Sequence, residues 1–236
     1  MSALEENTVV NFTGSFSDNA GDFHSAVWTF DGTPQAGTVN ETTHTVSASH
    51  TFDTAGVYLV TLTITDDCGQ TVATNQVGGF DALVVVYDPN AGFVTGGGWI
   101  NSPAGAYAPN PNLVGQANFG FVSKYQKGAN VPDGQTEFKL KVANLNFHST
   151  VYEWLVVAGA KAQYKGSGTI NGTGNYGFML TAIDGDLSGG GGVDKFRIRI
   201  WDKNNGDAVI YDNQMSAGIN DNPTTALAVG SIVIHK

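Results

Sequence analysis

The sequence predicts an all-β protein, with one β-sandwich followed by a second, larger antiparallel β-sandwich or jelly-roll-like module. Only 14% of the residues are charged, while the chain holds 31 glycines and many runs rich in Val, Thr, Phe and Tyr. These runs alternate apolar and polar residues, which is the pattern of strands with one buried face. A length of 236 residues is too great for one small sandwich and suits two.

The charge distribution predicts a boundary between the two modules. Residues 1–92 contain 11 Asp and Glu and no Lys or Arg, whereas residues 93–236 contain 10 acidic and 11 basic residues. The two parts therefore carry −11 and +1, which sum to the net charge of −10. An acidic chain without clustered cations is a poor partner for nucleic acid, and a cation such as Ca²⁺ suits it better.

Four period-two runs predict the strands of the first module, residues 1–90. They are TVVNFTGSF (8–16), SAVWTF (25–30), VYLVTLTIT (57–65) and DALVVVYD (81–88). Asp, Gly and Pro residues between them, as in Asp31–Pro34 and Asp66–Gly69, are typical of turns. Short strands at this spacing predict a β-sandwich.

Within this module, AVWTFDG and the later HTFDTAGVYLVTLTITDDCG resemble the PKD domain, an immunoglobulin-like module. The residues that match its pattern are Trp28, Phe30, Asp31, Gly32, Phe52, Gly56, Tyr58, Val60, Leu62 and Asp66. The family's glycine between the positions of Phe30 and Asp31 is missing, which changes that turn. The resemblance implies a spacer or adhesive module of a secreted or cell-surface protein.

The resemblance also implies a candidate Ca²⁺ site, because some members of the family bind Ca²⁺ near the first loop. In this chain the loop is SDNAGDFHS, and its candidate ligands are Asp18, Asn19 and Asp22. Ca²⁺ prefers several oxygen ligands, which these side chains and nearby carbonyls can supply. The alternative is an Asx-rich turn whose side chains bind their own backbone.

Nine further runs predict the strands of the second module, residues 93–236. They begin with GFVTGGGWI (92–100) and end with ALAVGSIVIHK (226–236). Asn171-Gly172 and Asn205-Gly206 are strong signals for tight hairpins between successive strands. No run has a helical period, so a second sandwich or jelly-roll-like sheet pair is expected.

The stretches FVTGGGWINSPAGAY and GVDKFRIRIWDKNNGDAVIYDN resemble the post-COAP-1 domain, a C-terminal module of microbial secreted and surface proteins. This resemblance implies no catalytic residue. We expect Trp99 in the core of the module, with Gly96–Gly98 allowing a close backbone approach. The alternative is that Trp99 and Tyr107 form an exposed platform for a sugar.

The segment DKFRIRIWD (194–202) predicts a ligand-binding face. Alternation places Phe196, Ile198 and Ile200 on one side of this strand. The candidate ligand-binding residues are on the other side: Lys195, Arg197, Arg199 and Trp201. Such cations could hold carboxylates or sulfates of a polysaccharide while Trp201 stacks on a sugar, and Lys139 and Lys141 could join them. The alternative is a solvated face whose cations pair with Glu137, Glu153 or Asp194.

The loop AIDGDLSGGGGVD (182–194) is a second candidate for Ca²⁺. Asp184, Asp186 and Asp194 flank its glycines, but the later ligands of an EF-hand are missing. The alternative is a flexible hairpin loop. Asp202, Asn204 and Asp207 are explained by the Asn-Gly turn.

These features predict that the chain is not an enzyme. It lacks a Gly-x-Ser-x-Gly or His-Glu-x-x-His motif, its single cysteine is Cys68, and no apolar run is long enough to span a membrane. MSALEENTVV is no signal peptide, so we expect a leader and flanking modules to be absent from this chain. The predicted function is a structural or adhesive segment of a secreted or surface-anchored microbial protein, with Ca²⁺ as the one possible cofactor. The alternatives are a carbohydrate-binding accessory module that binds polysaccharide, and a self-associating subunit of an extracellular fibre or layer that pairs through residues 226–236.

Overall fold

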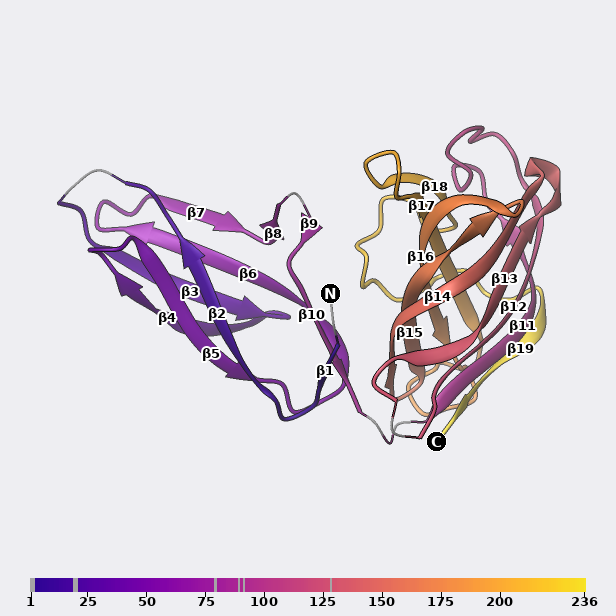
Figure 1. Cartoon of the computed structure of the whole chain (residues 1–236), viewed down its shortest axis with the longest axis horizontal. Coiled ribbons are helices and arrows are strands. Elements are labelled where there is room, and N and C mark those ends of the chain that lie inside the picture. The colour runs from indigo at the N-terminus through magenta and orange to yellow at the C-terminus, as the bar shows by residue number, and fades with distance from the viewer. Residues whose placement is uncertain (1–2, 19–20, 79, 89, 91, 128) are drawn as a thin grey trace. The chain divides into compact units, whose positions relative to one another are not determined.

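The computed structural model describes residues 3–18, 21–78, 80–88, 90, 92–127 and 129–236. Strands make up most of this backbone, and the predicted all-β fold class is confirmed (Figure 1). The chain divides into two compact units, Ala3–Val86 and Tyr87–Lys236. Among the described residues, no helix is long and apolar enough to cross a membrane.

The first unit is a β-sandwich whose strands form one hydrogen-bonded path in the order β1-β10-β6-β3-β4-β5-β2, with β7 on β6. Strands β8 and β9, which come between β7 and β10 in the chain, form a separate two-stranded sheet. The bounds of these strands are β1 Leu4–Glu5, β2 Val9–Ser15, β3 His24–Phe30, β4 Thr33–Asn40, β5 Thr45–Thr51, β6 Gly56–Asp66, β7 Thr71–Thr74, β8 Gln76–Val77, β9 Phe80–Asp81 and β10 Leu83–Tyr87.

Strand β4 joins the two layers of this sandwich. Its first half pairs with β3 and its last residues pair with β5. The path therefore turns over, so that Phe12 of β2 contacts Phe30 of β3 at a ring distance of 4.8 Å. Trp28, Leu62 and Val46 complete the buried core between the layers.

Strands β4 and β5 were not expected from the sequence. Their residues, TPQAGTVN and TVSASHT, are mostly small and polar, so the apolar half of the alternation is weak. The predicted turn at Asp31–Pro34 is shorter than expected, because only Asp31 and Gly32 have positive φ (46° and 84°). Thr33 and Pro34 already pair with β3.

The second unit is a nine-stranded antiparallel sheet in the order β18-β17-β16-β15-β14-β13-β12-β11-β19. All nine predicted strands are present, and the Asn171-Gly172 and Asn205-Gly206 hairpins connect β15 to β16 and β17 to β18. The bounds are β11 Phe93–Ser102, β12 Gly115–Tyr125, β13 Pro132–Leu140, β14 Leu145–Ala158, β15 Lys161–Ile170, β16 Thr173–Ile183, β17 Lys195–Asp202, β18 Ala208–Asp212 and β19 Val229–His235.

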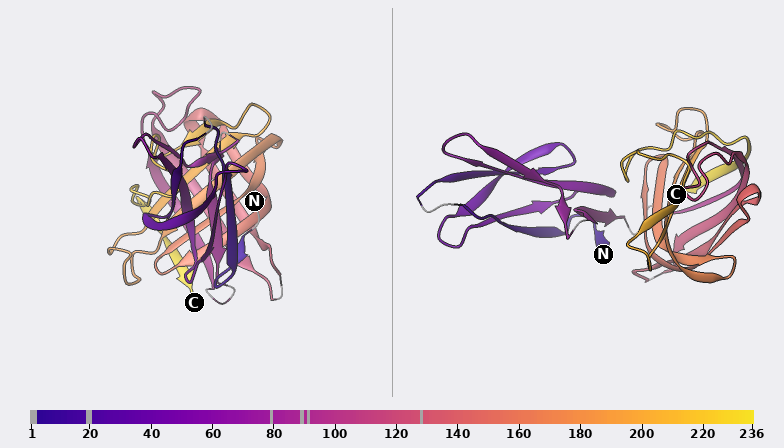
Figure 2. Two further views of the ribbon diagram at one scale, coloured as in Figure 1. Left: turned by 90° about the vertical axis from the view of Figure 1, so that its left-hand side faces the viewer. Right: turned by 90° about the horizontal axis from the view of Figure 1, so that it is seen from above.

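This sheet folds over so that its two halves face each other across one core (Figure 2). The rings of Phe119 on β12 and Phe196 on β17 are 4.1 Å apart, although four strands separate β12 from β17 in the sheet. Phe138 and Tyr211 meet in the same way, at 4.6 Å. The core therefore forms between strands that are distant in the sheet.

Trp99 does not lie in this core, so the expected position of this residue was wrong. Val94 and Ile100 of β11 are fully buried, and alternation therefore turns Trp99 to the outer face, where it is only partly buried. Tyr107 instead packs against the core, so the two rings form no common platform. The expected close approach is present at Gly98, where a Cβ atom would lie 2.1 Å from the Val229 carbonyl oxygen.

Candidate functional site

The outer face of β17 carries the four predicted ligand-binding residues. Phe196, Ile198 and Ile200 are fully buried in the core, so Lys195, Arg197, Arg199 and Trp201 point to the opposite side of the sheet. Three strands separate β17 from β13, so Lys139 does not join this group. The predicted direction of the alternation is correct, but the four residues have different surroundings.

Arg197 is buried and paired, so it is not available to a ligand. Its guanidinium binds both carboxylate oxygens of Asp212, with Nε–Oδ1 3.0 Å and Nη2–Oδ2 2.8 Å. It also donates to the carbonyl oxygens of Gly218 and Ala217, at 2.7 and 3.3 Å. Only 3% of Arg197 is exposed. The interpretation of Arg197 as a ligand-binding residue is therefore corrected: it stabilises the fold.

The segment that covers Arg197 is residues 213–224, which we call the strap. Side chains of β15 also hold it, because Lys161 Nζ donates to the Asn220 carbonyl oxygen at 2.8 Å and Gln163 Nε2 to that of Ile219 at 3.3 Å. Asn213 anchors its start through hydrogen bonds with the backbone of Phe196 and Ile198. The strap thus removes one end of the β17 outer face from solvent.

Trp201 and Arg199 lie beyond the strap's anchor and remain partly exposed. A Cβ atom on Gly177, the cross-strand neighbour of Trp201, would lie 2.2 Å from the indole, so the ring lies against the Gly177 backbone. Lys165 Nζ is 5.9 Å from the ring centre and forms an ion pair with Glu153 at 3.0 Å. Lys165 is a member of this group that the sequence did not suggest, because it comes from another strand.

The two outer aspartates of the glycine-rich loop close an edge of the sheet. Asp184 Oδ2 accepts the backbone N–H of Ile234 at 2.9 Å, and Asp194 Oδ2 accepts that of Ile232 at 2.7 Å. Their other oxygens accept the N–H groups of Asp186 and Gly185, at 3.0 and 2.7 Å. Both carboxylates therefore act as backbone acceptors, a role that needs no metal.

The positions of Asp184 and Asp194 concern the predicted calcium site and the predicted free edge of β19. In the described part of the chain no group of three or more His, Cys, Asp or Glu residues is placed to hold a metal ion, and the Asp186 side chain is exposed. Calcium binding by Asp184, Asp186 and Asp194 stays a prediction.

The sequence suggested that strand β19 offers a free edge to a neighbouring chain. In the structure, β19 pairs with β11 on one side, and Asp184 and Asp194 accept two of its N–H groups on the other.

In the first loop of the first unit, Asp18 binds a histidine. His24 Nε2 is 2.7 Å from Asp18 Oδ2, and His24 Nδ1 is 3.0 Å from Glu41 Oε2. The backbone N–H of His24 also donates to Glu41 Oε1 at 2.7 Å. Asp22 is exposed, and Asn19 lies outside the described residues. The calcium interpretation of Asp18, Asn19 and Asp22 therefore stays a prediction.

The His24 cluster has coupled electrostatics. Hydrogen bonds to Glu41 and Asp18 raise the pKa of His24 above its usual 6.5. The backbone N–H and the side chain of His24 lower the pKa of Glu41 below its usual 4.5. Sequence reasoning missed this cluster because Glu41, which follows β4, lies 17 residues from His24 in the chain and joins Asp18 and His24 of the first loop only in the folded structure.

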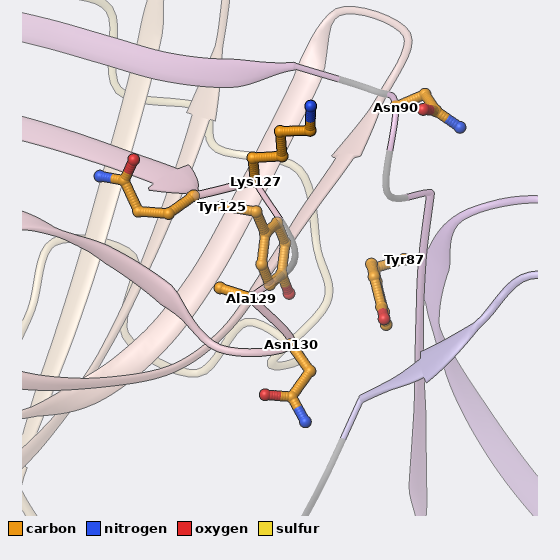
Figure 3. Close-up of a pocket in the computed structure, with 7 residues that line it drawn as sticks. Tyr87, Asn90, Tyr125, Lys127, Ala129 and Asn130 are labelled. Atoms are coloured by element: carbon orange, nitrogen blue, oxygen red, sulfur yellow. The ribbon is translucent and has the colours of Figure 1, made fainter.

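A surface hollow of about 420 Å³ lies beside Tyr125 at the end of β12 (Figure 3). Tyr87 and Tyr125 stack there at 5.1 Å, and Lys127, Ala129 and Asn130 form part of its wall. Burial raises the pKa of Tyr125 to about 12, and its hydroxyl both donates to and accepts from the backbone of Leu155. The two hydrogen bonds of Tyr125 therefore fix the end of β12 against β14.

Comparison with known proteins identifies part of the chain. Residues 1–78 match the family model described as PKD domain, so the predicted resemblance of the first unit is confirmed over these residues. Searches of curated proteins and of solved structures gave no match to the chain. The resemblance of residues 93–236 to the post-COAP-1 domain stays a prediction.

Proposed function

We propose that the chain is a non-catalytic structural and adhesive segment of a secreted or surface-anchored microbial protein. The PKD domain at residues 1–78 carries this proposal, because such domains generally serve as structural or adhesive modules outside the cell. The second unit supports it, because its outer sheet edge is satisfied by its own aspartates rather than left open. Closure of the β19 edge disfavours the addition of a foreign strand there.

Adhesion of beads coated with the full chain tests this proposal. The beads are passed under flow over surfaces coated with microbial polysaccharides, with extracellular proteins or with serum albumin. We expect retention on at least one polysaccharide or extracellular protein and none on albumin. Equal detachment from all surfaces would remove the adhesive role.

The proposal includes a more specific part, that Ca²⁺ binds to the chain and stabilises its fold. The acidic composition of the first unit is the reason for this part. Residues 1–92 carry 11 acidic groups without a compensating Lys or Arg. A bound Ca²⁺ would stabilise the fold by about 4 kcal/mol at a thousandfold excess over its dissociation constant. Thermal unfolding with excess Ca²⁺ and with chelator measures this, and identical melting temperatures would remove calcium from the proposal.

An alternative function is self-association into a fibre or layer. The first unit has a sheet edge through which two chains could pair. Strand β2 ends the sheet path and pairs with β5 alone among the described strands. Exposed edges of this kind can pair with another chain. A rise in apparent mass with concentration in size-exclusion chromatography would support a fibre or layer subunit, and a constant monomer would remove it.

A further inference from the structure

The outer face around Trp201 combines an aromatic surface with cations. The indole lies against the backbone of Gly177, where no side chain separates it from the sheet. Trp201 is only partly buried. Lys165 Nζ lies over the ring, 5.9 Å from its centre, so a ligand would meet the indole beside this ammonium group. An aromatic ring held this way against a rigid sheet can stack against the C–H face of a pyranose ring with little loss of side-chain entropy.

Among the described residues, Arg199 beside Trp201 has no carboxylate partner. Arg199 precedes Trp201 by two residues on the same face, and its guanidinium has no hydrogen bond or ion pair with any residue that the structure describes. Asp212 is the cross-strand neighbour of Arg199, but Arg197 occupies both of its oxygens. An unpaired, partly buried guanidinium attracts an anion, and carboxylates fit it in two-pronged geometry.

Two lysines extend this positive group. Lys203 Nζ donates to the Ser167 hydroxyl at 3.0 Å, and Lys165 pairs with Glu153. Among the outward-facing residues named here, the three cations Arg199, Lys165 and Lys203 stand against one carboxylate, Glu153, in a protein whose net charge is −10. The charge of this face is therefore complementary to an anionic ligand and opposite to that of the whole molecule.

We propose that the face formed by Arg199, Trp201, Lys165 and Lys203 binds an acidic polysaccharide through a pyranose unit that bears a carboxylate. The sugar ring stacks on the Trp201 indole, and its carboxylate binds Arg199 while the lysines contact neighbouring units. A polysaccharide presents such units repeatedly, so weak single contacts add to a useful avidity. This inference deepens the adhesive role proposed above and rests on it.

Titration of the full chain with defined oligosaccharides tests the inference. Oligogalacturonate supplies the carboxylated ligand, cello-oligosaccharide the neutral one and a heparin oligosaccharide the sulfated one. We measure tryptophan fluorescence and calorimetric heat at low and at physiological salt. Oligogalacturonate is expected to bind at both, more tightly than the sulfated ligand, and the neutral ligand to bind at least ten times more weakly.

Variants assign the binding to this face. Arg199→Gln is expected to weaken oligogalacturonate binding by roughly 10- to 100-fold, because a charge-assisted bond between buried or partly buried groups is lost. Lys203→Gln should weaken it less, and Trp201→Phe should weaken it while removing most of the fluorescence change. Lys139→Gln is the matched control, since it removes one cation from β13, which is separated from β17 by three strands.

Thermal melting of each variant separates folding from binding. If Trp201→Phe does not fold, Arg199→Gln and Lys203→Gln still decide the question. Equal weakening by Arg199→Gln and Lys139→Gln would show attraction by net charge alone and overturn the inference, as would preference for the sulfated or neutral ligand. Absence of oligogalacturonate binding, with coated beads still retained on an extracellular protein, would overturn this inference and leave the adhesive role intact.

Discussion

The Arg197–Asp212 pair shows how one residue stabilises the second unit from beneath a segment that has no strand of its own. Both side chains are almost fully buried, and Arg197 also binds two carbonyl oxygens of the strap. Replacing Arg197 by Met leaves Asp212 charged and buried, which should lower the free energy of unfolding by about 3–5 kcal/mol. Urea unfolding of the full chain measures the loss.

The exposed ion pair between Lys165 and Glu153 is the matched control for this prediction. Both side chains keep about a quarter of their surface exposed, and Glu153→Gln should cost less than about 1 kcal/mol. If Arg197→Met and Glu153→Gln cost the same, the buried pair is not the anchor of the strap. Replacing Arg197 and Asp212 together by Met and Leu should recover much of the loss.

His24 predicts a pH dependence of stability in the first unit. Its raised pKa means that its contribution is complete below the unfolded value of 6.5 and is lost as the pH rises through the folded pKa. The lowered pKa of Glu41 works in the opposite direction: its contribution is present above 4.5 and is lost as the pH falls through the folded value. The cluster should therefore stabilise most between these two limits.

Calorimetry from pH 4 to 9 (about five units, spanning both limits) tests this with the wild type and His24→Gln. The wild type should lose melting temperature on the alkaline side of the His24 pKa, and His24→Gln should remove that part of the profile. A neutral imidazole has one N–H and cannot donate to both Asp18 and Glu41, which is the physical cause. An unchanged profile in the variant would assign the pH dependence to other groups.

Residue-level prediction from the sequence succeeded where it depended on alternation and failed where it depended on surroundings. The direction of Arg197 and Trp201 follows from period-two geometry, and it is correct. The burial of Arg197 depends on the strap, which crosses from β18 to β19 and has no periodic pattern. Glu41 meets Asp18 and His24 of the first loop only after folding, so its position in the sequence carried no signal.

At the scale of elements, Asp184 and Asp194 close the β19 edge as a neighbouring strand would. Asp184→Ala leaves the buried N–H of Ile234 without an acceptor, at a cost of about 1–3 kcal/mol, and also removes the acceptor of the part-buried N–H of Asp186. Hydrogen exchange should accelerate at Ile234 in this variant and at Ile232 in Asp194→Ala. The exposed Asp186→Ala should change stability by less than about 0.5 kcal/mol.

The glycines of β11 and β12 provide an internal comparison. A Cβ atom at Gly96 would lie 2.4 Å from the Phe121 ring, so Gly96→Ala should destabilise by about 1–3 kcal/mol through overpacking. At Gly120 a Cβ atom meets nothing within 4 Å, so Gly120→Ala should be neutral or stabilise by about 0.4–1 kcal/mol. Equal effects in urea unfolding would contradict the packing described for Gly96.

The elements that sequence patterns predicted are those with a strong apolar half. Strands β12 and β13 alternate clearly between buried and exposed residues, whereas the residues of β4 and β5 are mostly small and polar. Which strands face each other across the core could not be predicted from the sequence. The contact between β12 and β17 depends on how far the whole sheet curls. The pairing of β15, β16 and β17 brings Lys165 near Trp201, whereas Lys203 follows Trp201 by two residues in the sequence.

At the scale of the whole molecule, the two parts of the chain differ in charge: residues 1–92 carry −11 and residues 93–236 carry +1. The acidic PKD unit has no Lys or Arg, so every cation that could bind an anionic glycan belongs to the second unit. Binding of an acidic polysaccharide should therefore weaken as salt rises, because the contacts are ionic and partly exposed. Full insensitivity to salt would argue against a cationic face.

We propose that this molecule binds an acidic polysaccharide without cleaving it. One reaction tests it directly: the full chain is incubated with polygalacturonate, and bound protein and newly formed reducing ends are measured in the same sample. Bound protein is expected to increase to saturation while reducing ends stay at the level of the protein-free control. Accumulation of reducing ends in proportion to protein and time would contradict it.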